Sequence, residues 1–371
     1  MNILILNWKD IKHPQVGGAE IIVYELAKRM VEKGDRVTWF CRSFKGGNKK
    51  DNIEGIEIVR RGSLYSVYIH AVLYYLLLKK KPDIVIDMSN TIYWQTPLWV
   101  RKSKIIAYLN QLAKEVFDWE YSPFLAKLGK IIEKLQYATY KKITFICYAN
   151  STKRDLIDYG IPGKNIHTFP LGLDHTRYKP GKKSKYPLFL CVSRLVRMKR
   201  TDLAIEAFAQ VVKEYKSARL AIVGYGYERG RLEKSVDEMK LGKSVYFVDK
   251  NNLFFTKSVK DQKVKIMQRA WCLLFPSVKE GWGMTVTECA ACGTPSIVTD
   301  VTGLRDSVIK DKTGIIVSAN PSAYEIARQM MMLIENDRMR EGFSKNAIEW
   351  AGEFNWERSF EEFYSLIKEL S

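Results

Sequence analysis

Continuous apolar runs alternate with amphipathic stretches along the first half of the chain. The run MNILILN (residues 1–7) precedes AEIIVYELAKRMVEKG, which has helical periodicity, and the apolar run RVTWFC follows. Further apolar runs occupy residues 56–59, 83–88, 104–109 and 143–149. Because these runs do not alternate with polar positions, they predict strands that are buried on both faces, in a parallel sheet that helices cover.

The same alternation starts again in the second half. Apolar runs recur, with helical stretches between them, at residues 187–194, 219–226, 245–248, 271–277 and 295–300. GLDHTRYKPGKKSKYP separates the two series, and its Pro, Gly and Lys residues indicate a linker. The sequence therefore predicts an α/β protein of two doubly wound domains, residues 1–180 and 181–355, facing each other across a ligand-binding cleft. An amphipathic helix at 356–371 is expected to pack back on the first domain.

The charge balance favours an anionic partner. The chain of 371 residues has a formal net charge of +19, and residues 1–180 hold 29 Lys and Arg against 17 Asp and Glu. Anionic lipid, phosphorylated substrates and nucleic acid all fit such a balance. Because no zinc finger, no RNP-like aromatic motif and no concentrated Lys/Arg tail accompanies the charge, we expect no nucleic-acid partner.

The cysteines and the longest apolar run indicate a cytoplasmic protein. The six cysteines are scattered, mostly within apolar runs, as in reduced proteins. Cys289 and Cys292 form a C-x-x-C without a second pair or a histidine cluster, so no metal is expected. The first apolar run predicts a strand rather than a signal peptide, and residues 67–78 are too few to cross a bilayer.

Glycines occur where predicted strands give way to helices. Gly17 and Gly18 would let backbone N–H groups approach an anion, although a loop with positive φ would explain them equally. Gly224, Gly226 and Gly230 follow a later strand, but their spacing departs from the G-x-G-x-x-G of dinucleotide sites. A tight strand-to-helix turn accounts for these three glycines.

Charged residues follow two predicted strands of the second domain. Arg194 and Lys199 lie just after the first of these strands, where two cations can neutralise a diphosphate, or can simply form a solvated loop. KEGWGMTVTECAACGTP contains Glu280 and Glu288, with a helix expected to start near Thr285. Thr285-x-x-Glu288 also fits a capping box, whereas no capping rule accounts for Glu280.

These motifs together resemble the retaining family-4 glycosyltransferases of the GT-B fold, which has two Rossmann-like domains. The resemblance extends over nearly the whole chain and is carried by GGAE, NSTKRDLIDYGIPGKNIHTFPLGLD, SRLVRMKRTDLAIEAF, LAIVGYG and EGWGMTVTECAACGTPSIVTD. It implies transfer of a sugar from a UDP- or GDP-sugar to a glycan or lipid-linked acceptor, in the synthesis of envelope polysaccharide, glycolipid or protein glycan. No cofactor and no metal are implied, and no Asp-x-Asp metal motif occurs in the chain.

The resemblance also implies residue roles. Arg194 and Lys199 would bind the donor diphosphate, Glu280 would hold hydroxyls of the transferred sugar, and Glu288 would hold the ribose hydroxyls. Further donor contacts would come from Gly17, Gly18, Gly281, Trp282, Gly283, Met284 and Thr285, and residues 245–252 would approach the nucleotide base. With the leaving phosphate stabilised by fixed cations, no carboxylate nucleophile is assigned.

The acceptor side departs from the family pattern. Many relatives carry a histidine just after the strand at residues 104–109, where this chain has Asn110. Glu115 or Asp118 could substitute for it, or could be surface acids. Residues 124–142 predict a helix that either lies on anionic lipid at the inner face of the membrane or packs on its own sheet. Alternative functions are a sugar-nucleotide epimerase, another GT-B enzyme, or a basic protein that binds membrane or nucleic acid.

Overall fold

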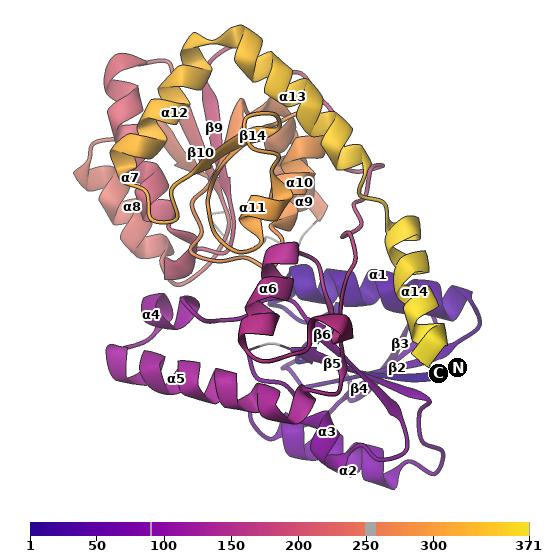
Figure 1. Ribbon diagram of the computed structural model, residues 1–371. Coiled ribbons are helices and arrows are strands. Elements are labelled where there is room, and N and C mark those ends of the chain that lie inside the picture. Colours follow the sequence, from indigo (N-terminus) through magenta and orange to yellow (C-terminus); the bar gives the residue numbers. More distant parts are fainter. Residues whose placement is uncertain (90, 249–256, 371) are drawn as a thin grey trace. The chain divides into compact units, whose positions relative to one another are not determined.

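The computed structural model describes residues 1–89, 91–248 and 257–370 (Figure 1). The chain forms two compact units. The first comprises Met1–Lys114, Lys127–Pro170 and the C-terminal segment from Trp356, and the second comprises Glu115–Ala126 and Leu171–Asn355.

An eight-stranded sheet forms the centre of the first unit, in the order β3-β4-β2-β1-β5-β6-β7-β8. All neighbouring strands are parallel except β3, which runs antiparallel to β4. The strands are β1 (Asn2–Leu6), β2 (Arg36–Cys41), β3 (Lys50–Ile53), β4 (Ile56–Arg60), β5 (Ile84–Ser89), β6 (Lys104–Leu109), β7 (Thr144–Cys147) and β8 (Ile166–Thr168). Because the parallel strands share a direction, their carboxyl ends lie along one edge.

Helices cover both faces of this sheet (Figure 1). The helices of this unit are α1 (Gly18–Glu32), α2 (Val67–Leu77), α3 (Thr96–Trp99), α5 (Pro123–Gln136, from Lys127 on), α6 (Asn150–Asp158) and α14 (Trp356–Leu370), with 3-10 helices η1 (Tyr137–Tyr140) and η2 (Gly163–Asn165). Leu4 and Leu6 share a buried cluster with Ala71 of α2. On the other face, α14 packs beside α1, and its Tyr364 hydroxyl donates to Asp35 over 2.8 Å.

The second unit contains a six-stranded parallel sheet in the order β11-β10-β9-β12-β13-β14. Its strands are β9 (Leu188–Val192), β10 (Arg219–Val223), β11 (Val245–Phe247), β12 (Cys272–Phe275), β13 (Ser296–Thr299) and β14 (Gly314–Val317). Its helices are α4 (Val116–Glu120), η3 (Arg197–Lys199), α7 (Thr201–Glu214), α8 (Arg229–Glu238), α9 (Lys257–Arg269), α10 (Met284–Ala291), α11 (Leu304–Ser307), α12 (Ala323–Glu335) and α13 (Asp337–Gly352). The prediction of two doubly wound α/β domains is confirmed.

The chain enters the second unit at Leu171, before the predicted boundary at 181. Contacts explain the difference: Leu173 pairs with Asn355 as an isolated bridge, and His175 Nε2 lies 2.8 Å from the Phe354 carbonyl oxygen. The predicted linker is therefore packed against the end of α13. Within the part of the chain that the structure describes, none of the helices has the length and hydropathy that crossing a bilayer requires.

Candidate active site

Gly224 and Gly226, which follow β10, allow their loop to pack closely against the loop that carries Arg194. A Cβ atom at Gly224 would lie 1.9 Å from the Ser193 carbonyl oxygen, and one at Gly226 would lie 2.1 Å from that of Leu195. The Leu195 amide donates to the Tyr225 carbonyl over 2.7 Å. These glycines therefore permit the close approach of two backbone segments, in agreement with the predicted tight turn.

Lys199 and Glu280 form a buried ion pair in the second unit. Lys199 ends η3 and Glu280 follows β12, so two neighbouring strands of the sheet bring them together. Burial lowers the pKa of the Lys199 ammonium, and the Glu280 carboxylate opposes that shift. The predicted sugar-binding acid and one of the predicted diphosphate-binding cations are thus direct partners.

The loop that carries Glu280 is fixed by residues that the sequence analysis did not single out. Gly303 has φ +83°, and a Cβ atom there would lie 2.3 Å from the Glu280 carbonyl oxygen. The Glu280 amide donates to the Thr302 carbonyl over 3.2 Å. Lys279 is buried and pairs with Glu115 of the same unit over 3.1 Å. A glycine before a short helix was the one signal that could have revealed this loop contact.

Helix α10 starts at Met284, with Gly283 as its N-cap at φ 95°. Because Gly283 and not Thr285 is the N-cap, the capping-box interpretation of Thr285 and Glu288 is wrong. The glycine adopts a left-handed conformation that other residues rarely adopt, and it has no side chain with which to cap the first N–H groups of the helix. Gly281 precedes this turn, and the indole of Trp282 is buried against Phe354, with ring centroids 5.3 Å apart.

Glu288 lies in a buried polar group of its own. Lys263 donates to its carboxylate over 2.7 Å, and the same ammonium lies 5.2 Å from the centroid of the Tyr178 ring. Burial, together with the neighbouring carboxylate of Glu288, raises the pKa of the Tyr178 hydroxyl. Neither Lys263 nor Tyr178 was predicted. Residues 249–252, predicted to approach the base, lie outside the described residues.

The first unit contains the remaining predicted residues except the two acids. Gly17 caps α1, and its amide donates to Glu20 over 2.6 Å. Neither Gly17 nor Gly18 has a positive φ, so the positive-φ explanation is wrong and close approach remains. Asn110 donates to the Ser89 carbonyl and accepts from the Tyr148 hydroxyl, both over 3.2 Å.

The two predicted acceptor-side acids belong to the second unit. Glu115 is paired with Lys279, and Asp118 is exposed on α4. Asn110, which follows β6 of the first unit, is therefore not in the same unit as the acids predicted to substitute for the usual histidine. Their roles stay predictions.

Two family models together match most of the chain. Residues 16–177 match the model of Glycosyltransferase Family 4, and residues 174–350 match that of glycosyl transferases group 1. The chain belongs to these glycosyltransferases. Family membership sets aside the epimerase and the basic binding protein as leading functions.

Curated relatives of this glycosyltransferase are distant in sequence. An uncharacterized glycosyltransferase of Methanocaldococcus jannaschii is 26% identical over 312 residues, covering 78% of this chain and 76% of the relative. Mannosylfructose-phosphate synthase of Agrobacterium fabrum is 23% identical over 414 residues, covering 96% and 88%. The D-inositol 3-phosphate glycosyltransferase of Corynebacterium urealyticum is 25% identical, and the match covers 56% of this chain but 50% of that relative.

Solved structures agree with the glycosyltransferase in fold over its whole length. The sucrose-phosphate synthase from Thermosynechococcus elongatus has a TM-score of 0.82 at 20% identity and covers 99% of this chain and 98% of its own. Anabaena HepE in complex with UDP has a TM-score of 0.73 at 16% identity, with 100% of both chains covered. These likenesses show the fold, and they confirm the predicted GT-B class.

Proposed function

We propose that this glycosyltransferase moves a sugar from a UDP- or GDP-sugar to a glycan or lipid-linked acceptor, with retention of configuration and without a metal ion. The observation that carries the donor half is the buried pair of Lys199 and Glu280 at the carboxyl edge of the second sheet, beside the start of α10. Anabaena HepE was solved with UDP-glucose, which supports a uridine nucleotide as the first donor to test.

The pair can exchange partners when a donor binds. A diphosphate would compete with Glu280 for the Lys199 ammonium, and the released carboxylate could then accept hydrogen bonds from sugar hydroxyls. As the glycosidic bond breaks, negative charge grows on the leaving phosphate, and the cations of the buried Lys199 and the exposed Arg194 would stabilise it. A phosphate oxygen would take the acceptor proton on the face that the leaving group vacates.

Glu288 has the surroundings that ribose recognition needs. Its buried carboxylate is paired with the Lys263 ammonium, and its oxygens can accept hydrogen bonds from two vicinal hydroxyls. The Tyr178 hydroxyl would hold that carboxylate in place by a hydrogen bond. The first N–H groups of α10 can contact phosphate or sugar oxygens.

Helix α5 supports a membrane-bound acceptor. Its apolar side chains at Leu128, Ile131, Ile132 and Leu135 are exposed. Glu133, by contrast, is buried and accepts from the Ala113 and Lys114 amides over 2.5 and 2.9 Å. The helix therefore does not pack its apolar stripe on its own sheet, as one interpretation of the sequence had it.

We infer that this face lies on the cytoplasmic leaflet. Lys127 and Lys134 are exposed on the same helix, and a row of apolar side chains flanked by lysines matches the boundary of an anionic bilayer. α2 exposes Ile69, Leu73 and Leu77 in the same way. Peripheral attachment would bring the first unit to a lipid-linked acceptor.

The donor proposal is tested with the variant Glu280→Gln. Incubation with a panel of UDP- and GDP-sugars should release nucleotide from the wild type, and the variant should lose about 100-fold or more of that rate. Glu214→Gln, an exposed acid at the end of α7, is the matched control and should keep the rate. A wild-type rate in Glu280→Gln, with the fold verified by circular dichroism, would overturn the assigned role.

A further inference from the structure

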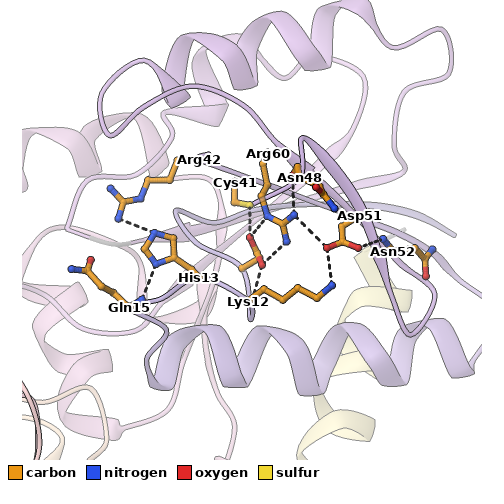
Figure 2. A network of polar contacts seen from close by, with 10 residues as sticks. Lys12, His13, Gln15, Cys41, Arg42, Asn48, Asp51, Asn52 and Arg60 are labelled. Carbon is orange, nitrogen blue, oxygen red and sulfur yellow. Dashed lines mark hydrogen bonds and ion pairs between the residues drawn. The ribbon is translucent and has the colours of Figure 1, made fainter. Parts of the chain in front are cut away.

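Arg42 follows the last residue of β2, at the carboxyl edge of the first sheet (Figure 2). Its Nη2 lies 3.2 Å from Nε2 of His13. Its Nε is buried and, among the described residues, has no hydrogen-bond partner. The described residues also supply no carboxylate in ion-pair contact with this guanidinium, so its charge lies half-buried without a counter-ion.

His13 cannot supply the missing acceptor. Its Nδ1 accepts a hydrogen bond from the Gln15 amide over 3.0 Å, so in the neutral ring the hydrogen must be on Nε2. Burial, and then the positive charges of Arg42 and Lys9, lowers the pKa of His13 to about 4, so the ring is neutral at pH 7. An N–H of the ring therefore faces an N–H of the guanidinium, and both donors need the same acceptor.

The carboxylates near Arg42 form their ion pairs with other cations (Figure 2). Asp10 accepts from Nε and Nη2 of Arg60 over 2.7 and 2.9 Å, from the Lys12 amide over 2.9 Å and from the Cys41 thiol over 3.3 Å. Asp51 accepts from Lys12 Nζ over 2.8 Å. Both carboxylates are therefore occupied in ways that leave Arg42 out, even though Asp10 and His13 belong to one loop.

We propose that Arg42 and the Nε2–H of His13 bind an oxyanion, a phosphate group, at the end of β2. A phosphate would place one oxygen where both facing donors can reach it, and the planar guanidinium fork suits such a ligand. The first unit would thereby select acceptors that carry a phosphate. That the phosphate belongs to the acceptor rests on the proposed function, whereas phosphate binding itself does not.

The test follows the His13 ring by NMR while inorganic phosphate is titrated into the whole protein at pH 7. The Cε1–H signal of His13 is assigned by its absence in His13→Gln, and His175, which lies in the second unit, is the internal reference. A saturable shift of the His13 signal is expected in the wild type. In Arg42→Gln the apparent affinity should fall at least tenfold.

The matched control is Arg36→Gln, because Arg36 is an exposed arginine at the opposite end of the same strand. It should bind phosphate as the wild type does. If Arg42→Gln does not fold, Arg42→Lys takes its place in the test. This variant keeps the positive charge but not the planar fork, so its affinity for phosphate should lie between those of the wild type and a variant without the charge. Repeating the titration with glycerol 3-phosphate and with phosphatidylglycerol vesicles separates a soluble from a lipid source of the phosphate.

Three outcomes would overturn the site: an immobile His13 signal, a shift that does not saturate, or an unchanged affinity in Arg42→Gln. Nucleotide release from the donor panel is measured on the same samples. Release without a His13 response would leave the glycosyltransferase proposal intact and remove the phosphate site. If phosphate shifts the His13 signal but no combination of donor and phosphorylated acceptor releases nucleotide, the assignment of the bound phosphate to the acceptor would be excluded.

Discussion

At the scale of single residues, His13 reports the charge at the end of β2. Burial and the cations Arg42, Lys9 and Arg60 lower its pKa to about 4, while Asp10 acts in the opposite direction. Because the folded value lies below the ordinary 6.5, the stability contribution of the neutral ring is complete above pH 6.5 and is lost as the pH falls toward 4. We expect the His13 NMR signal to titrate near pH 4.

Saturating phosphate should raise that midpoint, since an anion on Arg42 offsets the cation that lowers it. Arg42→Gln should raise it as well, without any phosphate. A midpoint near 6.5 in the phosphate-free wild type would contradict the charge balance inferred for this loop.

The sequence could not identify the site residues that only folding brings together from distant parts of the chain. Glu280 and Lys199 were predicted, because a motif marks each of them. Lys263 and Tyr178 were not, because only the folded chain brings them to Glu288 from α9 and from the linker. A lysine on a polar helix carries no local signal that it is buried against an acid.

At the scale of elements, the contact between the loops after β9 and β10 depends on Gly224. In Gly224→Ala the new methyl group would overlap the Ser193 carbonyl, and the loop that carries Arg194 must shift. We expect a loss of about 1–3 kcal/mol in the free energy of unfolding, measured with urea, and weaker binding of the donor.

Gly230→Ala provides the matched control. This glycine lies inside α8 with nothing within 4 Å of the added carbon, so alanine should stabilise the helix by up to about 1 kcal/mol. Equal destabilisation by the two substitutions would show that close approach is not what Gly224 provides.

The exposed face of α5 should bind vesicles. The wild type should sediment with phosphatidylglycerol vesicles and much less with neutral phosphatidylcholine, and added salt should weaken the binding. Ile131→Gln combined with Leu135→Gln should reduce binding about tenfold or more. Ile157→Gln, on α6 of the same unit, changes an exposed isoleucine of similar exposure and should bind as the wild type does. Equal sedimentation of the double variant would exclude this face.

Periodicity predicted the positions of the helices and strands better than it predicted what each of their faces contacts. Continuous apolar runs identified the buried strands of both sheets, because a strand buried on both faces has no polar period. The same reasoning found the amphipathic stretch of α5 but not the side that faces outward, which is decided by the hydrogen bonds that Glu133 accepts from the Ala113 and Lys114 amides. It also placed the start of α10 near Thr285, one residue from the observed Met284, although the left-handed conformation of Gly283 cannot be inferred from spacing.

At the scale of the whole molecule, a segment from the first half of the chain is built into the second unit. Glu115–Ala126 contains α4, where Glu120 accepts from the Met198 amide over 2.8 Å and also from the Tyr227 hydroxyl. The two-domain prediction missed this crossing, because no linker composition marks it. The chain beside Lys199 is thus held by a residue far away in sequence.

This crossing predicts that Glu120 positions η3 for donor binding. Glu120→Ala removes the acceptor of the Met198 amide, so hydrogen exchange at that amide should accelerate. A charge-assisted hydrogen bond contributes about 1.5–3 kcal/mol, so the KM for the donor should rise roughly tenfold or more. kcat should change less, because Arg194 and Glu280 are left in place.

Asp118→Ala is the matched control. It removes an exposed acid from the same short helix and should leave hydrogen exchange at the Met198 amide unchanged. Unchanged exchange in Glu120→Ala would mean that α4 does not hold the loop.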